Sequence, residues 1–146
     1  MDSLLSWEEA NQYCLSTYGT YLATIITDSD HQIARNIVGI KSTDNRNPWI
    51  GLTDKFIEGH WQWIDGTSCD YTSTGSCIDD IHWNVNEPNN KRNEEHYAEM
   101  RYIDGLYNDE GNDPSSRPFI CNNPQYGNIS NATSNQIPSP TEPLSS

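Results

Sequence analysis

Two stretches near the amino terminus carry the signals of amphipathic helices. In SWEEANQYC (6–14), Ser6 is followed three residues later by Glu9, which is the spacing of a capping box, and residues that favour helices come next. In TDSDHQIARNIVGI (27–40), Thr27 is a candidate N-cap. It precedes an apolar stripe at helical spacing: Ile33, Ala34, Ile37 and Val38. The pattern predicts one helix in each stretch.

After about residue 40, helical spacing gives way to short apolar runs, and a similar run precedes the second helix. Such runs, bounded by glycine or polar residues, predict strands. Trp61 and Trp63 alternate onto one face of a run and Trp49 begins another, so we expect all three indole rings in the core. The predicted strands are YLATI (21–25), WIGL (49–52), GHWQWIDG (59–66), AEMRYI (98–103) and RPFICN (117–122).

Two long stretches show neither the spacing of a helix nor the alternation of a strand. Residues 66–96 resemble a loop, and a loop of this length in a compact domain is usually functional or disordered. Residues 124–146 are rich in Ser, Thr, Pro and Asn with almost nothing to bury, which predicts a disordered tail. The tail carries glycosylation sequons at Asn128 and Asn131, so we expect a glycoprotein if the chain is secreted. One folded domain is therefore expected over residues 1–123.

The chain is strongly acidic. Its 21 acidic and 8 basic residues give a formal net charge of −13. Such a surface argues against nucleic acid as a partner and against anionic membranes, and it favours cations. No apolar run approaches the roughly 18–20 residues that span a bilayer, so we expect no membrane insertion. The opening MDSLLSWEEA also lacks the charged start and apolar stretch of a signal peptide.

The four cysteines indicate an oxidising compartment. Cys14, Cys69, Cys77 and Cys121 show none of the CxxC spacing that zinc sites prefer, so we interpret them as two disulfides. Disulfides favour an extracellular protein, either secreted or a cell-surface ectodomain. Because no signal peptide is present, we expect an excised or incomplete chain rather than a cytosolic protein.

Residues 86–100, NEPNNKRNEEHYAEM, concentrate side-chain oxygens around Pro88. Carboxylate and amide oxygens in loops are what a hard cation needs, and Ca2+ takes about 6–8 of them at roughly 2.3–2.6 Å. A cis bond before Pro88 would turn the two neighbours of the proline toward one point. A solvated acidic loop is the alternative interpretation. The candidate ligands, two of them from YND further along, are Glu87, Asn89, Glu95, Asn108 and Asp109.

Eight blocks of the chain resemble, in order and approximate spacing, those of C-type lectin-like domains. The blocks are SWEEANQYC, YLATI, WIGL, GHWQWIDG, WNVNEPNN, EEHYAEM, YND and FICN, from about residue 6 to 122. The resemblance implies an α+β fold with two helices, two small antiparallel sheets and a long loop region that carries the ligand. The stretch at 66–96 would then belong to that loop region.

The resemblance also implies a ligand. In sugar-binding members the candidate positions hold the principal Ca2+ and the sugar, and here they are Glu87, Asn89, Glu95, Asn108 and Asp109. The Glu-Pro-Asn triplet resembles the subgroup that binds mannose, glucose, GlcNAc and fucose, whereas galactose binders typically carry Gln-Pro-Asp. Two vicinal sugar hydroxyls would complete the Ca2+ shell, each donating to a carboxylate and accepting from an amide N–H.

The cysteines fit the family pattern in part. Cys14 with Cys121 matches the pair that closes the domain in the family. Cys69 with Cys77 can close a small loop upstream of the site. The first strand of the family would precede the first helix, and only MDSLL is left for it, so we expect this strand to be shortened.

Two further departures concern the surroundings of the site. The family's disulfide beside the site is absent, because Tyr97 stands at one cysteine position and the other falls near Asn112. A second Ca2+ site of some members is incomplete, because an amide and an imidazole replace acids at two of its four positions. Those positions are Asp54, Glu58, Asn90 and His96.

We expect a Ca2+-dependent carbohydrate-binding domain whose partners are glycans or glycoproteins. The alternative is a C-type lectin-like domain that binds a protein or an ice surface through the same loops, with no physiological sugar. An enzyme is not expected, because the acids are better explained as cation ligands and no nucleophile–base pairing is visible. The chain contains no heptad stalk, so its oligomeric state is left open.

Overall fold

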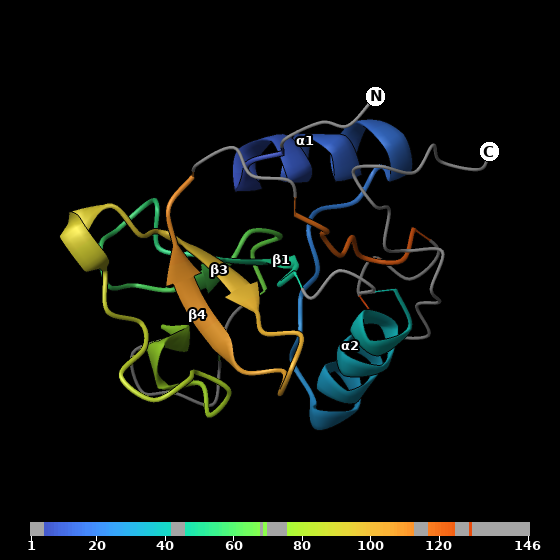
Figure 1. The fold of residues 1–146 in the computed structure, drawn as a ribbon. Helices are drawn as coiled ribbons and strands as arrows, with labels where there is room; N and C mark the ends of the chain where they lie inside the picture. The colour runs from blue at the N-terminus through green and yellow to red at the C-terminus, as the bar shows by residue number, and fades with distance from the viewer. Residues whose placement is uncertain are drawn as a thin grey trace.

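The computed structural model describes residues 5–41, 46–67, 69, 76–112, 117–124 and 129. The elements in these residues, shown in Figure 1, are the helices α1 (Trp7–Tyr18) and α2 (Asp28–Lys41), the strands β1 (Trp49–Thr53), β2 (Gln62–Trp63), β3 (Tyr97–Met100) and β4 (Tyr107–Glu110), and the short 3-10 turns η1 (Cys77–Asp79) and η2 (Lys91–Asn93). Two helices with a small antiparallel sheet confirm the α+β class.

Both predicted helices form, with the caps that the sequence predicts. Ser6 Oγ accepts from the backbone N–H of Glu9 at 3.2 Å, and Glu9 Oε1 accepts from the N–H of Ser6 at 2.9 Å, which completes the capping box of α1. Gly19 ends α1 at φ 72°, a left-handed conformation that glycine adopts without a Cβ clash. At the start of α2, Thr27 Oγ1 accepts from the N–H of Asp30 at 3.0 Å.

The four strands form one antiparallel sheet in the order β2-β1-β3-β4. In the pairing of β1 with β3, Thr53 lies opposite Tyr97. In the pairing of β3 with β4, Tyr97 lies opposite Glu110 and Met100 lies opposite Tyr107. The last residue of β1, the first residue of β3 and the last residue of β4 therefore lie side by side, at the same end of the sheet.

Three of the five strand predictions correspond to strands. WIGL lies in β1, GHWQWIDG contains the short β2, and AEMRYI contains most of β3, which begins one residue earlier at Tyr97. The predictions for 21–25 and 117–122 are wrong. These segments make isolated bridges only, Leu22–Cys121 and Trp49–Phe119. Each segment pairs with its neighbour through a single residue only. Pro118 has no N–H with which to extend the pairing into a ladder.

The strand β4 is not predicted by the sequence pattern. Its residues, YNDE, are polar and include types that are depleted from strands. Pairing with β3 along its whole length overrides that low propensity. The resemblance implies two small sheets, whereas the described residues form one four-stranded sheet together with isolated bridges.

The buried side chains of β1 belong to two clusters, one packed with each helix. Leu52 lies in the cluster that includes residues of α2, and Trp49 lies with Tyr97 in the cluster that includes residues of α1. Because side chains alternate along a strand, this arrangement buries every residue of β1. Trp49, Trp61 and Trp63 are at most 1% exposed, which confirms that they lie in the core.

All four cysteines are paired, as expected. Cys14 of α1 is bonded to Cys121, with Cα atoms 5.6 Å apart, and the bond joins positions 107 residues apart. Cys69 is bonded to Cys77, with Cα atoms 5.4 Å apart, and closes a loop of only eight residues. The first bond holds the two ends of the described fold together, and the second lies at the start of the long loop region.

Most of the predicted tail lies outside the described residues. Within 124–146 the structure describes Pro124 and Ile129, and Ile129 is buried in the cluster that includes residues of α2. The sequons at Asn128 and Asn131, and the opening MDSL, also lie outside the described residues. The disordered tail therefore stays a prediction. Among the described helices, none has both the length and the apolar character needed to cross a membrane.

Candidate metal centre

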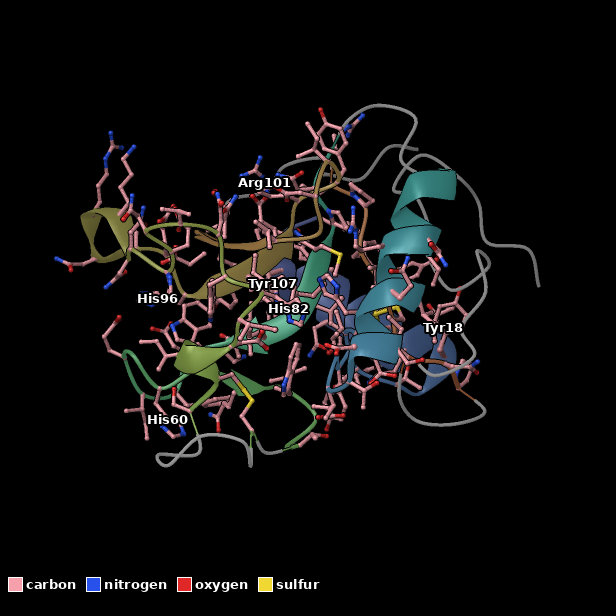
Figure 2. The ribbon with its side chains drawn as sticks, turned by 90° about the horizontal axis from the view of Figure 1, so that it is seen from below. Tyr18, His60, His82, His96, Arg101 and Tyr107 are labelled. Atoms are coloured by element: carbon pink, nitrogen blue, oxygen red, sulfur yellow. A yellow bond between two sulfur atoms is a disulfide. The ribbon has the colours of Figure 1, made fainter. Side chains whose placement is uncertain are left out.

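The loop that holds most of the predicted ligands is attached to β4 near its start. Trp83 forms a bridge to Tyr107, and the N–H of Asn84 donates to Tyr107 O at 2.9 Å. The indole Nε1 of Trp83 donates to Cys77 O at 3.0 Å. These contacts place the start of the loop beside the start of β4, close to α2, where His82 stacks on His31 with ring centroids 3.8 Å apart. His96, at the other end of the loop, lies on the side of the molecule away from α2 in Figure 2.

The asparagines of this loop have a backbone role. The Glu87–Pro88 peptide bond is cis. Close to it lie four non-glycine residues with positive φ: Asn86, Asn90, Arg92 and Asn93. Asparagine enters the left-handed region more readily than most residues, because its short polar side chain can bond to the local backbone. The run of asparagines therefore shapes the turns of the loop, in addition to supplying a candidate ligand.

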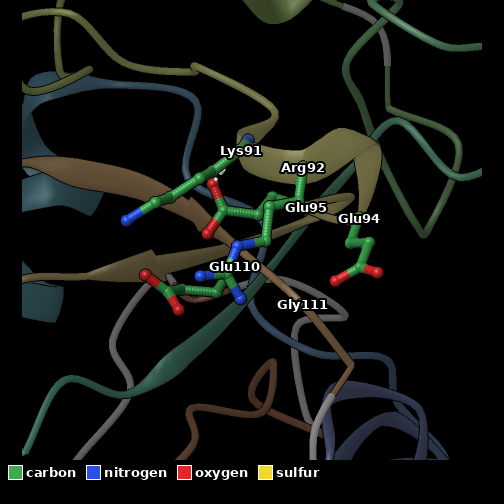
Figure 3. Close-up of a pocket in the computed structure, with 6 residues that line it drawn as sticks. All are labelled: Lys91, Arg92, Glu94, Glu95, Glu110 and Gly111. Carbon is green, nitrogen blue, oxygen red and sulfur yellow. Dashed lines mark hydrogen bonds between the residues drawn. The ribbon is translucent and has the colours of Figure 1, made fainter.

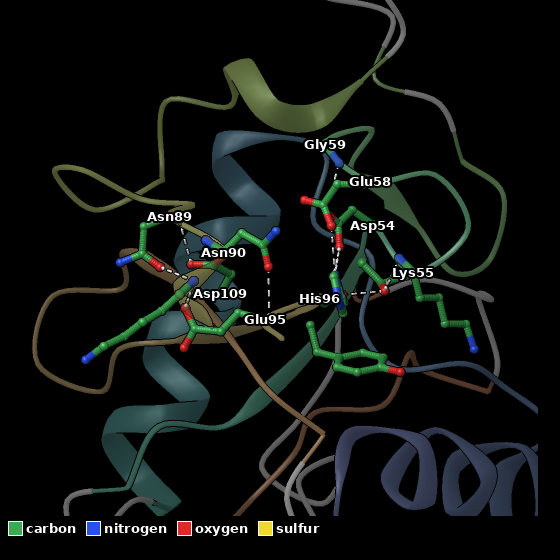
Figure 4. Close-up of polar contacts among 12 residues, drawn as sticks. Asp54, Lys55, Glu58, Gly59, Asn89, Asn90, Glu95, His96 and Asp109 are labelled. Atoms are coloured by element: carbon green, nitrogen blue, oxygen red, sulfur yellow. Dashed lines mark hydrogen bonds and ion pairs between the residues drawn. The ribbon is translucent and has the colours of Figure 1, made fainter. Parts of the chain in front are cut away.

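Four of the five predicted ligands come together, and Figure 4 shows the contacts around Asn89, Glu95 and Asp109. Asn89 Nδ2 donates to Glu87 Oε2 at 3.1 Å, and the N–H of Asn89 donates to Asp109 Oδ1 at 3.0 Å. The N–H of Lys91 contacts Glu95 Oε1 at 3.0 Å and Asn89 Oδ1 at 3.2 Å. The loop thus folds back on β4 and gathers carboxylate and amide oxygens from distant positions in the sequence.

The carboxylates of this group disfavour one another's charge. Burial, followed by a hydrogen bond and the charge of Asp109, raises the pKa of Glu87 to about 8. Burial and the charge of Asp109 also raise the pKa of Glu95, while the N–H of Lys91 lowers it. Glu87 Oε1 is buried without a hydrogen-bond partner among the described residues. A partly buried, partly unsatisfied set of hard oxygens is what Ca2+ coordinates, so these residues fit the ion.

Asn108, the fifth predicted ligand, lies beside the group and is held by other residues. Its Nδ2 donates to Glu99 Oε2 at 3.1 Å, and its Oδ1 accepts from Asn84 Nδ2 at 3.3 Å. It precedes Asp109 directly in β4. The structure therefore places Asn108 next to the group, with its amide oriented by Glu99 and Asn84.

Glu99 is a residue of the site region that the sequence pattern misses. It is 3% exposed in β3, opposite Asn108. Its carboxylate accepts from Asn47 Nδ2 at 3.0 Å and pairs with Arg117, whose guanidinium lies 4.5 Å from the centre of the Trp49 ring. A buried carboxylate needs such partners. In the sequence, the only signal that could have indicated this role of Glu99 is that an acid stands inside the apolar run of β3.

Three of the four positions of the second family site come together in the structure. His96 Nδ1 lies 3.0 Å from Asp54 Oδ1 and 3.2 Å from Glu58 Oε1. Asn90 Oδ1 instead accepts from the N–H of Glu95 at 3.2 Å. The structure therefore groups Asp54 and Glu58 with His96, while the amide oxygen of Asn90 is engaged by the backbone of Glu95.

Glu87, Asn89, Glu95 and Asp109 form the principal group, and a pocket of about 280 Å³, whose lining Figure 3 shows, includes one of them. Its lining residues are Lys91, Arg92, Glu94, Glu95, Glu110 and Gly111. Glu95 belongs both to the pocket and to the group of candidate metal ligands. A polar ligand held at the metal group could therefore extend into this pocket.

The chain matches the Lectin C-type domain family over residues 3–123. It is 33% identical over 119 residues to the C-type lectin lectoxin-Enh4 of Pseudoferania polylepis, a match that covers 80% of this chain and 69% of that protein. A match to C-type lectin domain family 4 member F of Rattus norvegicus is 36% identical over 69 residues. That match covers 47% of this chain and only 12% of the rat protein.

Solved structures share the fold. The carbohydrate-recognition domain of the human scavenger receptor C-type lectin aligns with a TM-score of 0.61 at 28% identity, covering 80% of this chain and 81% of that chain. The corresponding domain of cow CD23 was solved in the presence of a GlcNAc2Man3 oligosaccharide. It aligns with a TM-score of 0.62 at 25% identity, covering 80% of this chain and 78% of that chain. Since the family match spans most of the chain and the fold agrees, this chain belongs to the C-type lectin domain family.

Proposed function

We propose that this chain binds carbohydrate in a Ca2+-dependent manner and prefers sugars of the mannose type, which include glucose, GlcNAc and fucose. The observation that carries the proposal is the convergence of Glu87, Asn89, Glu95 and Asp109, with one buried, unpartnered oxygen of Glu87 among the described residues. Domains of this family generally bind Ca2+. When bound, the ion supplies positive charge to these carboxylates and coordination positions for sugar hydroxyls.

The preference for mannose-type sugars would come from the order of acid and amide. Glu87 offers acceptor oxygens only, whereas Asn89 offers N–H donors as well as an oxygen. A sugar hydroxyl donates to a carboxylate and accepts from an amide N–H, so it requires both kinds of group. Asn89 Nδ2 lies 3.1 Å from Glu87 Oε2, which puts donor and acceptor side by side. Asn108 remains the fifth proposed ligand, with Glu99 and Asn84 orienting its amide.

The proposed setting is extracellular, with glycans or glycoproteins as partners. Two disulfides favour an oxidising compartment. The cow CD23 domain, a structural relative, was solved in the presence of an oligosaccharide. Lectin domains of this family are generally binding proteins rather than enzymes. The end of the family match at residue 123 supports the proposed boundary between a folded domain and a tail.

A double substitution tests the class of sugar. Glu87→Gln with Asn89→Asp exchanges acid and amide around the ion while it preserves the number of oxygens. The ratio of mannoside to galactoside affinity should therefore fall by roughly tenfold, about 1.4 kcal/mol, while Ca2+ binding persists. Calorimetric titration of both methyl glycosides in saturating Ca2+ measures the ratio. If the double variant keeps the wild-type ratio, the orientation of the sugar hydroxyls does not set the preference.

A glycan array separates carbohydrate binding from the alternative of a protein or ice ligand. The chain should be retained by mannose-type glycans in Ca2+ and released in EDTA. Arg46→Ala is a suitable control, because Arg46 lies outside the ligand group and its removal should leave the array pattern unchanged. A blank array in Ca2+ from a folded, Ca2+-bound chain would favour a ligand other than sugar.

A further inference from the structure

Asp54, Glu58 and His96 form a second cluster next to the principal group, and Figure 4 shows the two side by side. His96 Nδ1 lies 3.0 Å from Asp54 Oδ1 and 3.2 Å from Glu58 Oε1. One ligand atom from each residue falls within 4.8 Å of the other two. Two carboxylates thus face a single imidazole, an excess of negative charge that a divalent cation would neutralise.

The sheet brings two members of this cluster together. Asp54 follows β1 directly and His96 precedes β3 directly, and Thr53 lies opposite Tyr97 in the pairing of the two strands. The N–H of Asp54 and the Oγ1 of Thr53 both donate to His96 O, at 3.2 and 2.6 Å. The separation of the two side chains is therefore set by adjacent strands.

A hydrogen bond from the backbone also fixes the orientation of the Asp54 side chain. Its side chain is 1% exposed, and its Oδ2 accepts from the N–H of Gly59 at 2.9 Å, which leaves Oδ1 facing His96. Metal-ligating carboxylates are typically oriented by hydrogen bonds of this kind. The side chain of Glu58, in contrast, is 56% exposed, so it can close over an ion that enters from solvent.

The imidazole of His96 determines which kind of metal ion the cluster suits. Ca2+ and Mg2+ take oxygen ligands, whereas Zn2+ combines histidine nitrogen with carboxylate oxygen at about 2.0–2.1 Å. A tetrahedron with those bond lengths has edges of about 3.3–3.4 Å. The observed separations of 3.0 and 3.2 Å are close to such an edge. A zinc ion could therefore fit between His96 and the two carboxylates after only small shifts of the side chains.

We propose that Asp54, Glu58 and His96 bind Zn2+, with water completing a tetrahedral shell. This site is distinct from the proposed calcium site, because none of its three ligands belongs to the principal group. Zinc should therefore bind while Ca2+ is saturating, and it should do so whether or not the chain binds sugar. Because a bound ion would join the end of β1 to the start of β3, zinc should also raise the thermal stability of the folded chain.

Titration of ZnCl2 into the Ca2+-saturated protein, followed by calorimetry, tests the proposal. The wild type should bind one equivalent of zinc, and Glu58→Gln and His96→Asn should each weaken binding by at least about tenfold. Glu58 is exposed, so its substitution leaves folding intact. His60→Asn is the matched control, because His60 lies in the same connection between β1 and β2 but outside the cluster, and it should bind zinc as the wild type does.

Cobalt substitution provides a second readout. Co2+ in a tetrahedral site of nitrogen and oxygen ligands absorbs visible light strongly, and this absorption should be lost in His96→Asn. Equal zinc binding by the wild type and His96→Asn would overturn the proposal, as would the absence of micromolar zinc binding by the wild type. Loss of zinc in Glu95→Gln but not in Glu58→Gln would place the ion at the calcium group and would also overturn it.

Discussion

Glu87 is the single side chain whose surroundings most require a cation. One of its carboxylate oxygens accepts from Asn89, and the other is buried without a partner among the described residues. Burial and the neighbouring Asp109 raise the pKa of Glu87 to about 8. At neutral pH the carboxyl group therefore holds a proton until a cation displaces it.

Calcium binding at pH 7 should accordingly release up to about one proton per ion. A raised pKa means that the proton is bound below about pH 8, so Ca2+ affinity should fall as the pH drops from 8. Ordinary carboxyl pKa values would instead predict a loss only below about pH 5. Calorimetry in two buffers of different ionisation enthalpy measures the release, and Glu87→Gln should remove most of it. Binding by the wild type at pH 7 without proton release would contradict the raised pKa of Glu87.

At the same scale, the identity of the candidate ligands could be predicted, but their surroundings could not. Glu87, Asn89, Glu95 and Asp109 are oxygen-bearing residues around a proline and in a short motif, which are local signals. The hydrogen bond of Asn108 to Glu99 joins two strands, so it depends on a register that the sequence pattern does not predict.

At the scale of elements, a relay of hydrogen bonds connects α1 to two positions near the site. The family resemblance implies a disulfide between the position of Tyr97 and one near Asn112. Here Tyr97 donates to Glu8 Oε2 at 2.8 Å, and the N–H of Glu8 donates to Asn112 Oδ1 at 3.1 Å. Burial, and then the bond to Glu8, raise the pKa of Tyr97, so its hydroxyl remains a donor at neutral pH. Glu8 therefore links the two positions without a covalent bond.

Tyr97→Phe should lower the free energy of unfolding by about 0.5–1.5 kcal/mol, because it removes one hydrogen bond and keeps the ring that packs on Trp7. Urea unfolding followed by circular dichroism measures the change. Tyr102→Phe, at a residue 39% exposed, is the matched control and should change stability by less than about 0.5 kcal/mol. An undiminished effect of Tyr97→Phe in a Glu8→Ala background would show that the relay does not stabilise the fold.

The helices could be predicted because their caps and apolar stripes are local. Ser6 with Glu9, and Thr27 before its stripe, form the expected contacts. Strand β4 could not be predicted, because its polar residues form a strand only through pairing with β3. The segments 21–25 and 117–122 carry apolar residues because they are buried, and burial alone does not distinguish a strand from an extended segment with single bridges.

At the scale of the whole molecule, the two disulfides constrain very different lengths of chain. Cys14–Cys121 joins residues 107 apart, which corresponds to about 4–5 kcal/mol on the loop-entropy model. Cys69–Cys77 joins residues eight apart, which corresponds to about 2–3 kcal/mol. The first bond should therefore determine whether the domain folds, and the second should act locally on the long loop region.

Replacing both Cys14 and Cys121 by serine should destabilise the domain by about 4–5 kcal/mol, and replacing Cys69 and Cys77 should cost about 2–3 kcal/mol. Thermal unfolding of the two double variants measures the difference, each serving as the control for the other. The Cys69 and Cys77 variant should keep the far-ultraviolet dichroism of the folded domain. A larger loss from that pair than from Cys14 and Cys121 would be inconsistent with the fold described here.

The measurement that bears most directly on the proposed function is calorimetric titration of methyl α-mannoside into the folded chain, once with Ca2+ and once with EDTA. With Ca2+, binding should be weak, with a Kd on the order of millimolar or about −4 kcal/mol, because only a few hydroxyls are engaged at an open site. With EDTA the heat of binding should disappear, and it should return when excess Ca2+ is added. Equal heats in Ca2+ and in EDTA would contradict the account, because the gathered carboxylates would then have no part in holding the sugar.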